Sequence, residues 1–376
     1  MQKNLQKRWI PKEIPDRELI QKLSSELKVN EVLSTLIAQR GIQSFKEARV
    51  YFNPSTDNLH DPFLMKDMQK VVERIESAIK KQEKIMIYGD YDVDGTTSVA
   101  LLYRYFSKFS KEIQYYVPNR FSEGYGVSRE GVDKAIESGV KLMIAIDCGI
   151  KDNHEVDFAK QQGIDFIICD HHTPGIKVPD AFAILNPRQT DCFYPFKDLS
   201  GCGIGFKLIQ AYTKAVQTET DPFELIDLVV VSIASDIVPV VGENRTLAYL
   251  GLQKINRNPL PVFKIMLESL ELKKELNITD LVFIIGPRLN ASGRISHASN
   301  TVDLLINNNA DEIRKIAIDI NAINLQRREL DKEIVEDALK KIEQDEALQK
   351  RNTTVLWDAG WHKGVIGIVA SRLTDS

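Results

Sequence analysis

The chain has 376 residues, of which 43% are hydrophobic and 27% charged, and its formal net charge is −4. This length and composition predict a globular protein with room for two packed domains. No apolar run approaches the roughly 18 residues that span a bilayer, and the charged start does not resemble a signal peptide, so we expect a cytoplasmic protein. Because the chain is slightly acidic, any phosphate-binding surface must be a local cluster of basic residues.

Residues 1–80 are predicted to form a helical lead-in. Loop signals occur at Asn53-Pro54 and Asp61-Pro62, and the stretch near 66–80 is amphipathic. The sequence assigns no chemistry to this part of the chain.

From Lys84 onward, short runs rich in Ile, Val, Tyr and Phe alternate with amphipathic stretches, a pattern typical of a parallel-sheet α/β domain. The predicted strands are 84–89, 113–118, 141–147, 164–170 and 182–186. The predicted helices between them are 96–108, 127–138 and 153–162. Apolar residues at helical spacing over 203–269 predict a helical cap on this doubly wound core.

A single long helix is predicted between Asp311 and about Asp345, because apolar residues recur there every three or four positions. At about 1.5 Å per residue it would reach roughly 50 Å, which is more typical of a connector between domains. A strand at 353–360 and a helical pattern after it then open a second α/β domain, which does not bury a core before Ser376. The predicted organisation is therefore a lead-in (1–80), a catalytic domain (81–309), a connector (310–350) and the start of a truncated second domain (351–376).

Acidic residues and histidines follow the predicted strands. They are Asp90, Asp92 and Asp94 after the first strand, Asp147 after the third, and Asp170, His171 and His172 after the fourth. The carboxyl ends of parallel strands open into one crevice, so these side chains should converge. Clustered carboxylates repel unless cations lie between them, and with imidazole they suit Mn²⁺ or Mg²⁺. Two such ions about 3.5–4 Å apart can activate water for in-line phosphoryl displacement, which predicts phosphoester hydrolysis.

Two simpler interpretations compete with this one. The run 90–95 resembles the start of a calcium-binding EF-hand loop, but Leu101 stands where the loop's final Glu belongs, and a predicted strand precedes it. Asp170, His171 and His172 taken alone could be a capping residue beside two surface histidines. Together with the other strand-end carboxylates, they favour the metal site.

At this point the motifs resemble a family. Residues 88–98, 145–149, 170–172, 234–239 and 286–294 resemble, in order and spacing, the five motifs of the DHH phosphoesterases, and 360–373 resembles the start of their DHHA1 domain. The segments DYDVDG (90–95), 118–126 and 200–207 resemble the RecJ branch. Family II pyrophosphatases carry a metal-binding His where this chain has Tyr88, which argues against that branch.

The resemblance implies a ligand set of five residues. Asp92 and Asp236 would hold one metal, Asp94 and His171 the other, and Asp147 would bridge both. Asp236 could not be found from spacing, although an Asp inside the apolar helical stretch VVVSIASDIVP needs a compensating partner. Asp90 would support the ligands, Asp170 would orient His171, and His172 would support the site or touch the scissile phosphate.

Basic residues must offset the acidic cluster if the substrate is a polyanion. The resemblance implies phosphate or DNA contacts at Arg120, Arg288, Asn290, Arg294, His362, Ser371 and Arg372. The glycine-rich run 200–207 could be a phosphate-cradling loop with Lys207, or its glycines could serve only the start of a helix. The residues leave both interpretations open.

The RecJ resemblance implies a 5′-to-3′ exonuclease that hydrolyses single-stranded DNA with two Mn²⁺ or Mg²⁺ ions, in DNA repair and recombination. A helicase and a single-strand-binding protein would be its partners. Two alternatives remain. A phosphodiesterase of short oligonucleotides or cyclic dinucleotides is disfavoured by the long connector, and a non-catalytic DNA-binding relative, of the kind found in the replicative helicase, by the presence of every expected Asp and His.

Overall fold

The computed structural model describes residues 8–351 and 353–374. The chain divides into two compact units, Met1–Leu59 and His60–Ser376. The division thus lies before the amphipathic stretch at 66–80, whereas the sequence placed the end of the lead-in at residue 80. That stretch forms α4 (Met68–Lys80), which packs against α8 and β5 of the larger unit.

The smaller unit contains three helices, α1 (Arg17–Leu27), α2 (Glu31–Ala38) and α3 (Phe45–Phe52), followed by a 3₁₀ turn at Thr56–Asn58. Each helix begins after a capping residue, Asp16, Asn30 or Ser44, whose side-chain oxygen accepts a backbone N–H of the first turn. The helices enclose a small core that includes Leu23, Ile37 and Ala48. The helical prediction is confirmed for this part.

The larger unit is built on a five-stranded parallel sheet, with the strand order β2-β1-β3-β4-β5. The strands are β1 (Ile85–Gly89), β2 (Ile113–Tyr116), β3 (Leu142–Ile146), β4 (Asp165–Cys169) and β5 (Ala183–Leu185). All five lie within or match the predicted runs. Gly89 is paired with Ile146, and Ile146 with Cys169, so the residues that follow β1, β3 and β4 emerge at one edge.

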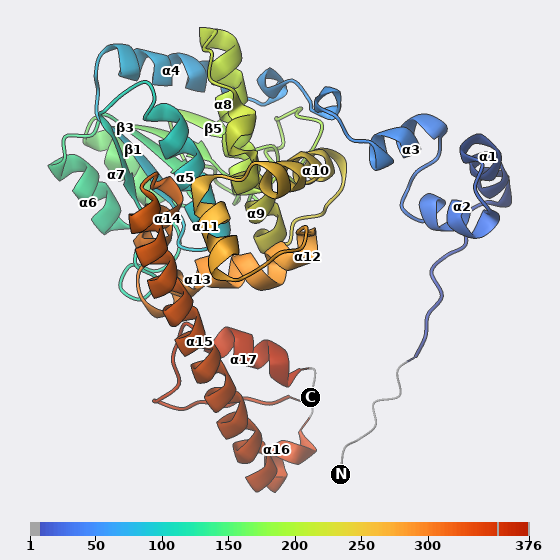
Figure 1. Ribbon diagram of the computed structural model, residues 1–376. Helices are drawn as coiled ribbons and strands as arrows, with labels where there is room; N and C mark the ends of the chain where they lie inside the picture. Colours follow the sequence, from blue (N-terminus) through green and yellow to red (C-terminus); the bar gives the residue numbers. More distant parts are fainter. Residues whose placement is uncertain (1–7, 352, 375–376) are drawn as a thin grey trace. The chain divides into compact units, whose positions relative to one another are not determined.

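Helices cover both faces of this sheet, which confirms the doubly wound α/β prediction (Figure 1). They are α5 (Val93–Phe106), α6 (Arg129–Glu137), α7 (Asn153–Gln161) and α8 (Gly201–Val216), together with α4. One core layer joins side chains of α6 and α7 to the sheet, with Tyr88, Val132 and Phe166 among its members. On the other face α5 contacts β1 and β3, and α8 contacts β3 and β4. Because both faces are covered, β1 and β3 are buried throughout.

The helical cap follows the sheet in sequence. It comprises a 3₁₀ turn at Pro222–Leu225, α9 (Ile226–Asp236), α10 (Gly242–Arg257), α11 (Pro261–Ser269), α12 (Ile278–Asp280), the π-helical Leu281–Ile285, α13 (Gly286–Ile295) and α14 (Ser299–Ile306). A further 3₁₀ turn, Pro62–Leu64, precedes α4. Helix α9 packs against α5, α8 and α10, which carries its C-terminal end to the edge of the sheet.

The predicted connector is a single helix, α15 (Ala310–Gln344), of 35 residues. Its first half packs against α11, α13 and α14, and α17 (Ile366–Leu373) packs against its second half (Figure 1). Ile334, Val365 and Val369 form the small core there. The short α16 (Glu346–Lys350) lies between α15 and α17 in sequence. Among the described residues, none of the helices combines the length and apolar composition of a membrane span.

The predicted strand at 353–360 is wrong, since this described segment contains no strand. Val355 and Trp357 are each 82% exposed. An extended segment becomes a strand only when a neighbour satisfies its backbone hydrogen bonds, and no other described strand lies beside these residues.

Candidate metal centre and its basic surroundings

The acidic residues after β1 are placed by a tight turn into α5. Asp92 caps the helix, and its Oδ1 accepts the N–H of Gly95 at 3.0 Å. A Cβ on Gly95 would lie 2.3 Å from the carbonyl oxygen of Asp90, so only glycine fits this turn. Asp147 follows β3 with a φ of +62°, a left-handed conformation that turns its side chain out of the strand direction. Local backbone geometry therefore presents these carboxylates at the sheet edge.

The side chains converge as the spacing predicted. Nε2 of His171 lies 3.1 Å from Oδ1 of Asp147, 3.7 Å from Oδ2 of Asp94 and 3.7 Å from Oδ2 of Asp236. Three overlapping groups have ligand atoms within 4.8 Å of one another: Asp147 with His171 and His172, Asp94 with His171 and Asp236, and Asp90 with Asp92 and Asp147. The structure thus brings together all five residues of the predicted ligand set.

Asp94 is held by the start of α8. Its Oδ2 accepts the N–H of Gly201 at 2.6 Å, and its Oδ1 accepts the N–H of Cys202 at 2.9 Å and the hydroxyl of Ser232 at 2.6 Å. The positive end of a helix dipole and three donors therefore stabilise this carboxylate. The glycine-rich run cradles a carboxylate of the protein itself.

The phosphate-cradle interpretation of Lys207 is therefore wrong. Its side chain is fully buried, and its Nζ lies 3.1 Å from Oε1 of Glu243 and 2.7 Å from the carbonyl oxygen of His60. A buried ammonium needs such partners, and this one has no solvent-facing part that a phosphate could reach.

Asp236 reaches the site from the other side of the domain, at the C-terminal end of α9. Ile237 follows it with a φ of +58° and ends the helix. The packing of α9 against α5 brings this carboxylate to His171. Sequence spacing could not find this residue, and the one signal was an acidic residue in an apolar helix.

The carboxylates of the cluster raise one another's pKa values. Burial, followed by the charge of Asp92, raises the pKa of Asp90 to about 8. Burial, followed by the charge of Asp94, raises the pKa of Asp236 to about 8. Burial and the surrounding carboxylates also raise the pKa of Asp147, while burial lowers the pKa of His171. The cluster therefore resists ionisation unless positive charge is supplied.

Unsatisfied atoms show that the residues fit bound metal. Oδ1 of Asp90, Oδ1 of Asp147 and Nε2 of His171 are buried, and within the described part of the chain they have no hydrogen-bond partner. Buried polar atoms rarely stay unpaired without a function. Carboxylate oxygens and one neutral imidazole nitrogen are a donor set suited to Mn²⁺ or Mg²⁺.

The expectation that Asp170 orients His171 is wrong, because Asp170 binds the neighbouring histidine. Its Oδ1 lies 2.7 Å from Nδ1 of His172 and accepts the backbone N–H of that residue, and its Oδ2 accepts the N–H of Ile150. These hydrogen bonds outweigh burial and lower the pKa of Asp170, and the same contact raises the pKa of His172. The other ring nitrogen of His172, Nε2, lies 3.1 Å from the hydroxyl of Tyr125, a residue that sequence reasoning did not select.

Guanidinium groups stand beside the acidic cluster. Arg120 lies over the ring of Tyr91 at 4.0 Å, and its Nε donates to the carbonyl oxygen of Gly293 at 2.9 Å. A Cβ on Gly293 would lie 2.3 Å from the carbonyl oxygen of Tyr91, so α13 packs directly on the turn that carries Asp92. Nη1 of Arg294 donates to the carbonyl oxygen of Gly364 at 3.1 Å.

The remaining predicted contact residues are spread over α13, the segment before α17, and α17. Nη1 of Arg288 donates to the carbonyl oxygen of Ile284, and Oδ1 of Asn290 is buried without a described hydrogen-bond partner. His362 packs edge-on against Phe121, next to Arg120. Ser371 is exposed on α17, and beside it Nη2 of Arg372 pairs with Oδ2 of Asp331 at 2.9 Å.

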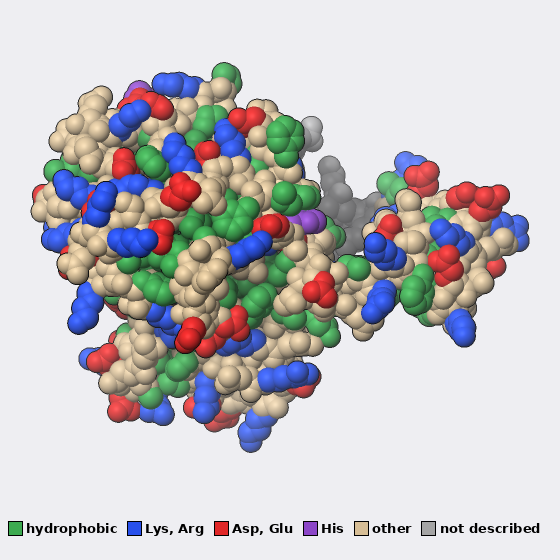
Figure 2. Space-filling model, turned by 90° about the horizontal axis from the view of Figure 1, so that it is seen from above, with side chains coloured by type: hydrophobic (Ala, Val, Ile, Leu, Met, Phe, Trp, Pro, Cys, Tyr) green, Lys and Arg blue, Asp and Glu red, His purple; other side chains and the backbone are tan. Residues whose placement is uncertain are grey.

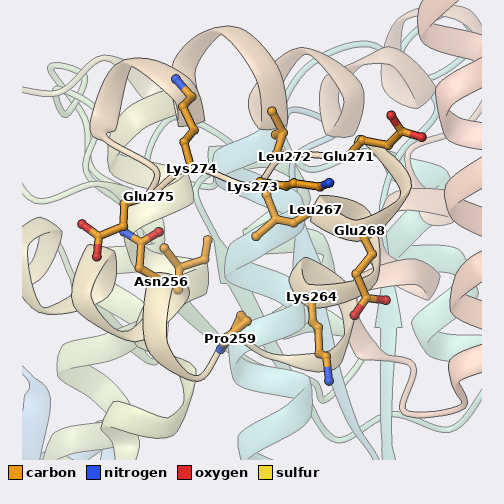
Figure 3. A pocket seen from close by; sticks show the side chains of 11 residues that line it. Asn256, Pro259, Lys264, Leu267, Glu268, Glu271, Leu272, Lys273, Lys274 and Glu275 are labelled. Atoms are coloured by element: carbon orange, nitrogen blue, oxygen red, sulfur yellow. The ribbon is translucent and has the colours of Figure 1, made fainter.

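Neither the charge distribution of the larger unit nor the cavity beside α10 provides a competing site. Acidic and basic side chains are mixed over the face of the larger unit seen in Figure 2, so no field of one sign covers it. A cavity of about 660 Å³ between α10 and the segment after α11 is lined by lysines and glutamates together (Figure 3). No residue of the predicted site lines this cavity.

Comparison with known proteins identifies the domain. Residues 84–233 match the DHH family, N-terminal domain. This part of the chain is a DHH domain. Over 362 residues the chain is 38% identical to the single-stranded-DNA-specific exonuclease RecJ of Bacillus subtilis, in an alignment that covers 96% of this chain and 45% of the relative. It is 37% identical over 361 residues to RecJ of Dickeya dadantii, with 92% of this chain and 62% of the relative covered.

Solved structures of RecJ also resemble this chain. A crystal structure of exonuclease RecJ bound to manganese matches with a TM-score of 0.75 and 29% identity, covering 83% of this chain and 78% of that one. RecJ of Thermus thermophilus in complex with Mn²⁺ matches with a TM-score of 0.82 and 25% identity, covering 96% and 51%. The chain, with its DHH domain, spans about half to three fifths of the length of the two curated relatives.

Proposed function

We propose that this chain hydrolyses phosphodiester bonds of single-stranded DNA as a two-metal exonuclease that acts from the 5′ end. The observation that carries the proposal is the convergence of Asp94, Asp147, Asp236 and His171 at one edge of the sheet. Within the described part of the chain, Oδ1 of Asp147 and Nε2 of His171 have no hydrogen-bond partner. The similarity to RecJ, a single-stranded-DNA-specific exonuclease, supports the substrate class. The polarity is proposed from the motif resemblance.

In this proposal Asp94, His171 and Asp236 would hold one ion, Asp92 would hold the second, and Asp147 would contribute to both. The ligand atoms of Asp236 group with those of Asp94 and His171, whereas the resemblance implied a pairing with Asp92. When bound, two Mn²⁺ or Mg²⁺ ions supply Lewis-acid activation of the attacking water and stabilise charge on the phosphate. Asp90 and Asp94 differ in their surroundings. Asp94 is fixed by three donors from α8 and α9, whereas Oδ1 of Asp90 lacks a described partner.

His172 has a different role. Asp170 accepts a hydrogen bond from Nδ1–H of His172, which orients the imidazole and favours its charged form. We infer that Nε2–H then donates to an oxygen of the scissile phosphate. Tyr125, which contacts Nε2 in this structure, would hold the ring in place until substrate enters.

The basic residues bind the rest of the strand in this proposal. Arg120 and Arg294 offset the negative charge beside the acidic cluster, and Arg288 adds a phosphate contact from α13. Asn290, His362, Ser371 and Arg372 extend the contacts toward α17. Most nucleic-acid affinity comes from such phosphate contacts summed along the chain.

The wider setting of this activity is a further part of the proposal. We propose that the protein acts in the cytoplasm in DNA repair and recombination. A helicase that unwinds duplex and a single-strand-binding protein are the partners that an enzyme with this substrate would use.

The test uses single-stranded oligonucleotides labelled at the 5′ or the 3′ end, incubated with Mn²⁺ or Mg²⁺. We expect the 5′ label to appear first as a mononucleotide, with no cleavage in the presence of a chelator. Blunt duplex of the same sequence and a cyclic dinucleotide are the comparison substrates. Equal cleavage of blunt duplex, or cleavage of the cyclic dinucleotide alone, would contradict the proposal.

A further inference from the structure

Helix α15 carries a guanidinium that the sequence did not single out. We propose that Arg327 binds a backbone phosphate of the single strand beside Arg294, and that Asn324 positions its side chain for this contact. The inference rests on the proposed function, since it needs a polyanionic strand that leaves the metal centre along α13 and α15.

The side chain of Arg327 is held by one hydrogen bond, but not all of its N–H donors have a described acceptor. Its Nη2 donates to Oδ1 of Asn324 at 3.0 Å, and Asn324 is itself buried on the same helix. Its Nε is buried and has no hydrogen-bond partner among the described residues. An N–H group left in this state destabilises the free protein. The side chain as a whole is only half-buried, so an incoming oxygen acceptor can approach the guanidinium.

The hydrogen bond of Arg327 also argues against a purely structural role. An arginine that ties two helices together donates across their interface. Here the donated bond stays within α15, from one turn to the next. In the described part of the chain Arg327 forms no ion pair.

The neighbouring guanidiniums are likewise held by uncharged acceptors. Arg120 donates to the carbonyl oxygen of Gly293, and Arg294 donates to that of Gly364. Helix α13, which carries Arg294, packs along α15. After burial, the charges of Arg120 and Arg327 are the causes that lower the pKa of Arg294, so both of these groups repel Arg294. Oriented positive charges without carboxylate partners form a site for an anion.

Asp331 continues the row toward α17. Residues 324, 327 and 331 are spaced three and four apart, so they share one face of α15. Asp331 is 1% exposed, and its Oδ2 pairs with Nη2 of Arg372. One carboxylate between Arg327 and Arg372 leaves a net positive charge. The row therefore runs from Arg294 through Arg327 to Arg372, and a phosphodiester strand matches its chemistry.

The test compares Arg327→Gln with Lys332→Gln in the full chain. Lys332 lies on the same helix with a side chain that is 77% exposed, so its substitution removes an equal charge outside the row. The affinity for a fluorescent single-stranded oligonucleotide is measured in a chelator at several salt concentrations. We expect Arg327→Gln to weaken binding about tenfold and to reduce the slope of log affinity against log salt by about 0.7, the value for one phosphate contact on a single strand. Lys332→Gln should change neither quantity.

A second variant covers the case in which Arg327→Gln does not fold. Arg327→Lys keeps the charge and loses the forked donors, so it should retain the salt slope and bind about threefold more weakly. Wild-type affinity in Arg327→Lys, or equal behaviour of Arg327→Gln and Lys332→Gln, overturns the inference while the proposed function stands. A wild-type chain that neither binds nor cleaves single-stranded DNA overturns both.

Discussion

Oδ2 of Asp94 accepts a 2.6 Å hydrogen bond from the backbone N–H of Gly201, at the first turn of α8. The same glycine lies against a second acidic residue, because a Cβ placed on it would be 2.7 Å from Cβ of Asp147. The start of α8 therefore sets the positions of two carboxylates at once. This contact ties the glycine-rich segment to the metal centre without any phosphate.

Gly201→Ala should accordingly reduce activity. The added methyl group would push Asp147 away from His171, so we expect at least a tenfold loss of Mn²⁺-dependent nuclease rate, on the order of what a misplaced catalytic group costs. Gly203→Ala is the matched control, because its Cβ would meet Leu199 at an ordinary 3.4 Å. Rates measured on one oligonucleotide decide the matter, and equal rates for the two variants would refute this account of Gly201.

Asp147→Asn should cost about three orders of magnitude or more in rate, because this carboxylate stands between both proposed metal positions. The protein should remain folded, since the substitution replaces a buried carboxyl group whose pKa is raised by burial and by neighbouring carboxylates. Thermal unfolding with and without Mn²⁺ provides a second readout. We expect the melting temperature in chelator to rise or stay constant, and the metal-induced increase to shrink. More than a tenth of wild-type rate would exclude the bridging role.

Stability without metal should depend on pH. Asp90 and Asp236 have raised pKa values of about 8 in the folded chain, against about 3.9 when unfolded. Between these values the folded state binds more protons than the unfolded state, so the free energy of unfolding falls as pH rises from about 4 to 8. Melting in chelator at about pH 6 and about pH 8 should show the loss, and Asp90→Asn should reduce it. A melting temperature that rises over this interval would contradict the raised pKa values.

Lys207→Met should destabilise the protein without lowering its affinity for DNA. Among the described residues, the substitution leaves the buried Glu243 with Tyr194 and His60 as hydrogen-bond donors, and breaking such a pair costs about 3–5 kcal/mol. Lys108→Met is the control, because its exposed pair with Glu224 should contribute at most about 1 kcal/mol. Denaturant unfolding measures both. A reduced salt dependence of DNA binding in Lys207→Met would restore the phosphate-cradle interpretation.

Several features of the site were determined locally and could be predicted from the sequence. The apolar runs of β1, β3 and β4 are legible because a strand covered on both faces needs apolar residues on both sides. Asp92, Asp147 and His171 closely follow those strands, so parallel topology alone places them at a common edge. The apolar stripe of α15 could also be predicted, because the periodicity of apolar residues along one helix is a property of the local sequence.

Other features were decided only by tertiary packing. Asp170 pairs with His172 and not with His171, because the backbone after β4 directs consecutive side chains to different neighbours. Lys207 is an interior ion-pair partner and not a phosphate ligand, because α8 buries it against Glu243. Asp236 and Arg327 join the site through the packing of α9 on α5 and of α15 on α13, contacts between residues far apart in the chain. Periodicity and spacing along the chain report which face of an element is buried, but the partner across that face depends on how the elements pack.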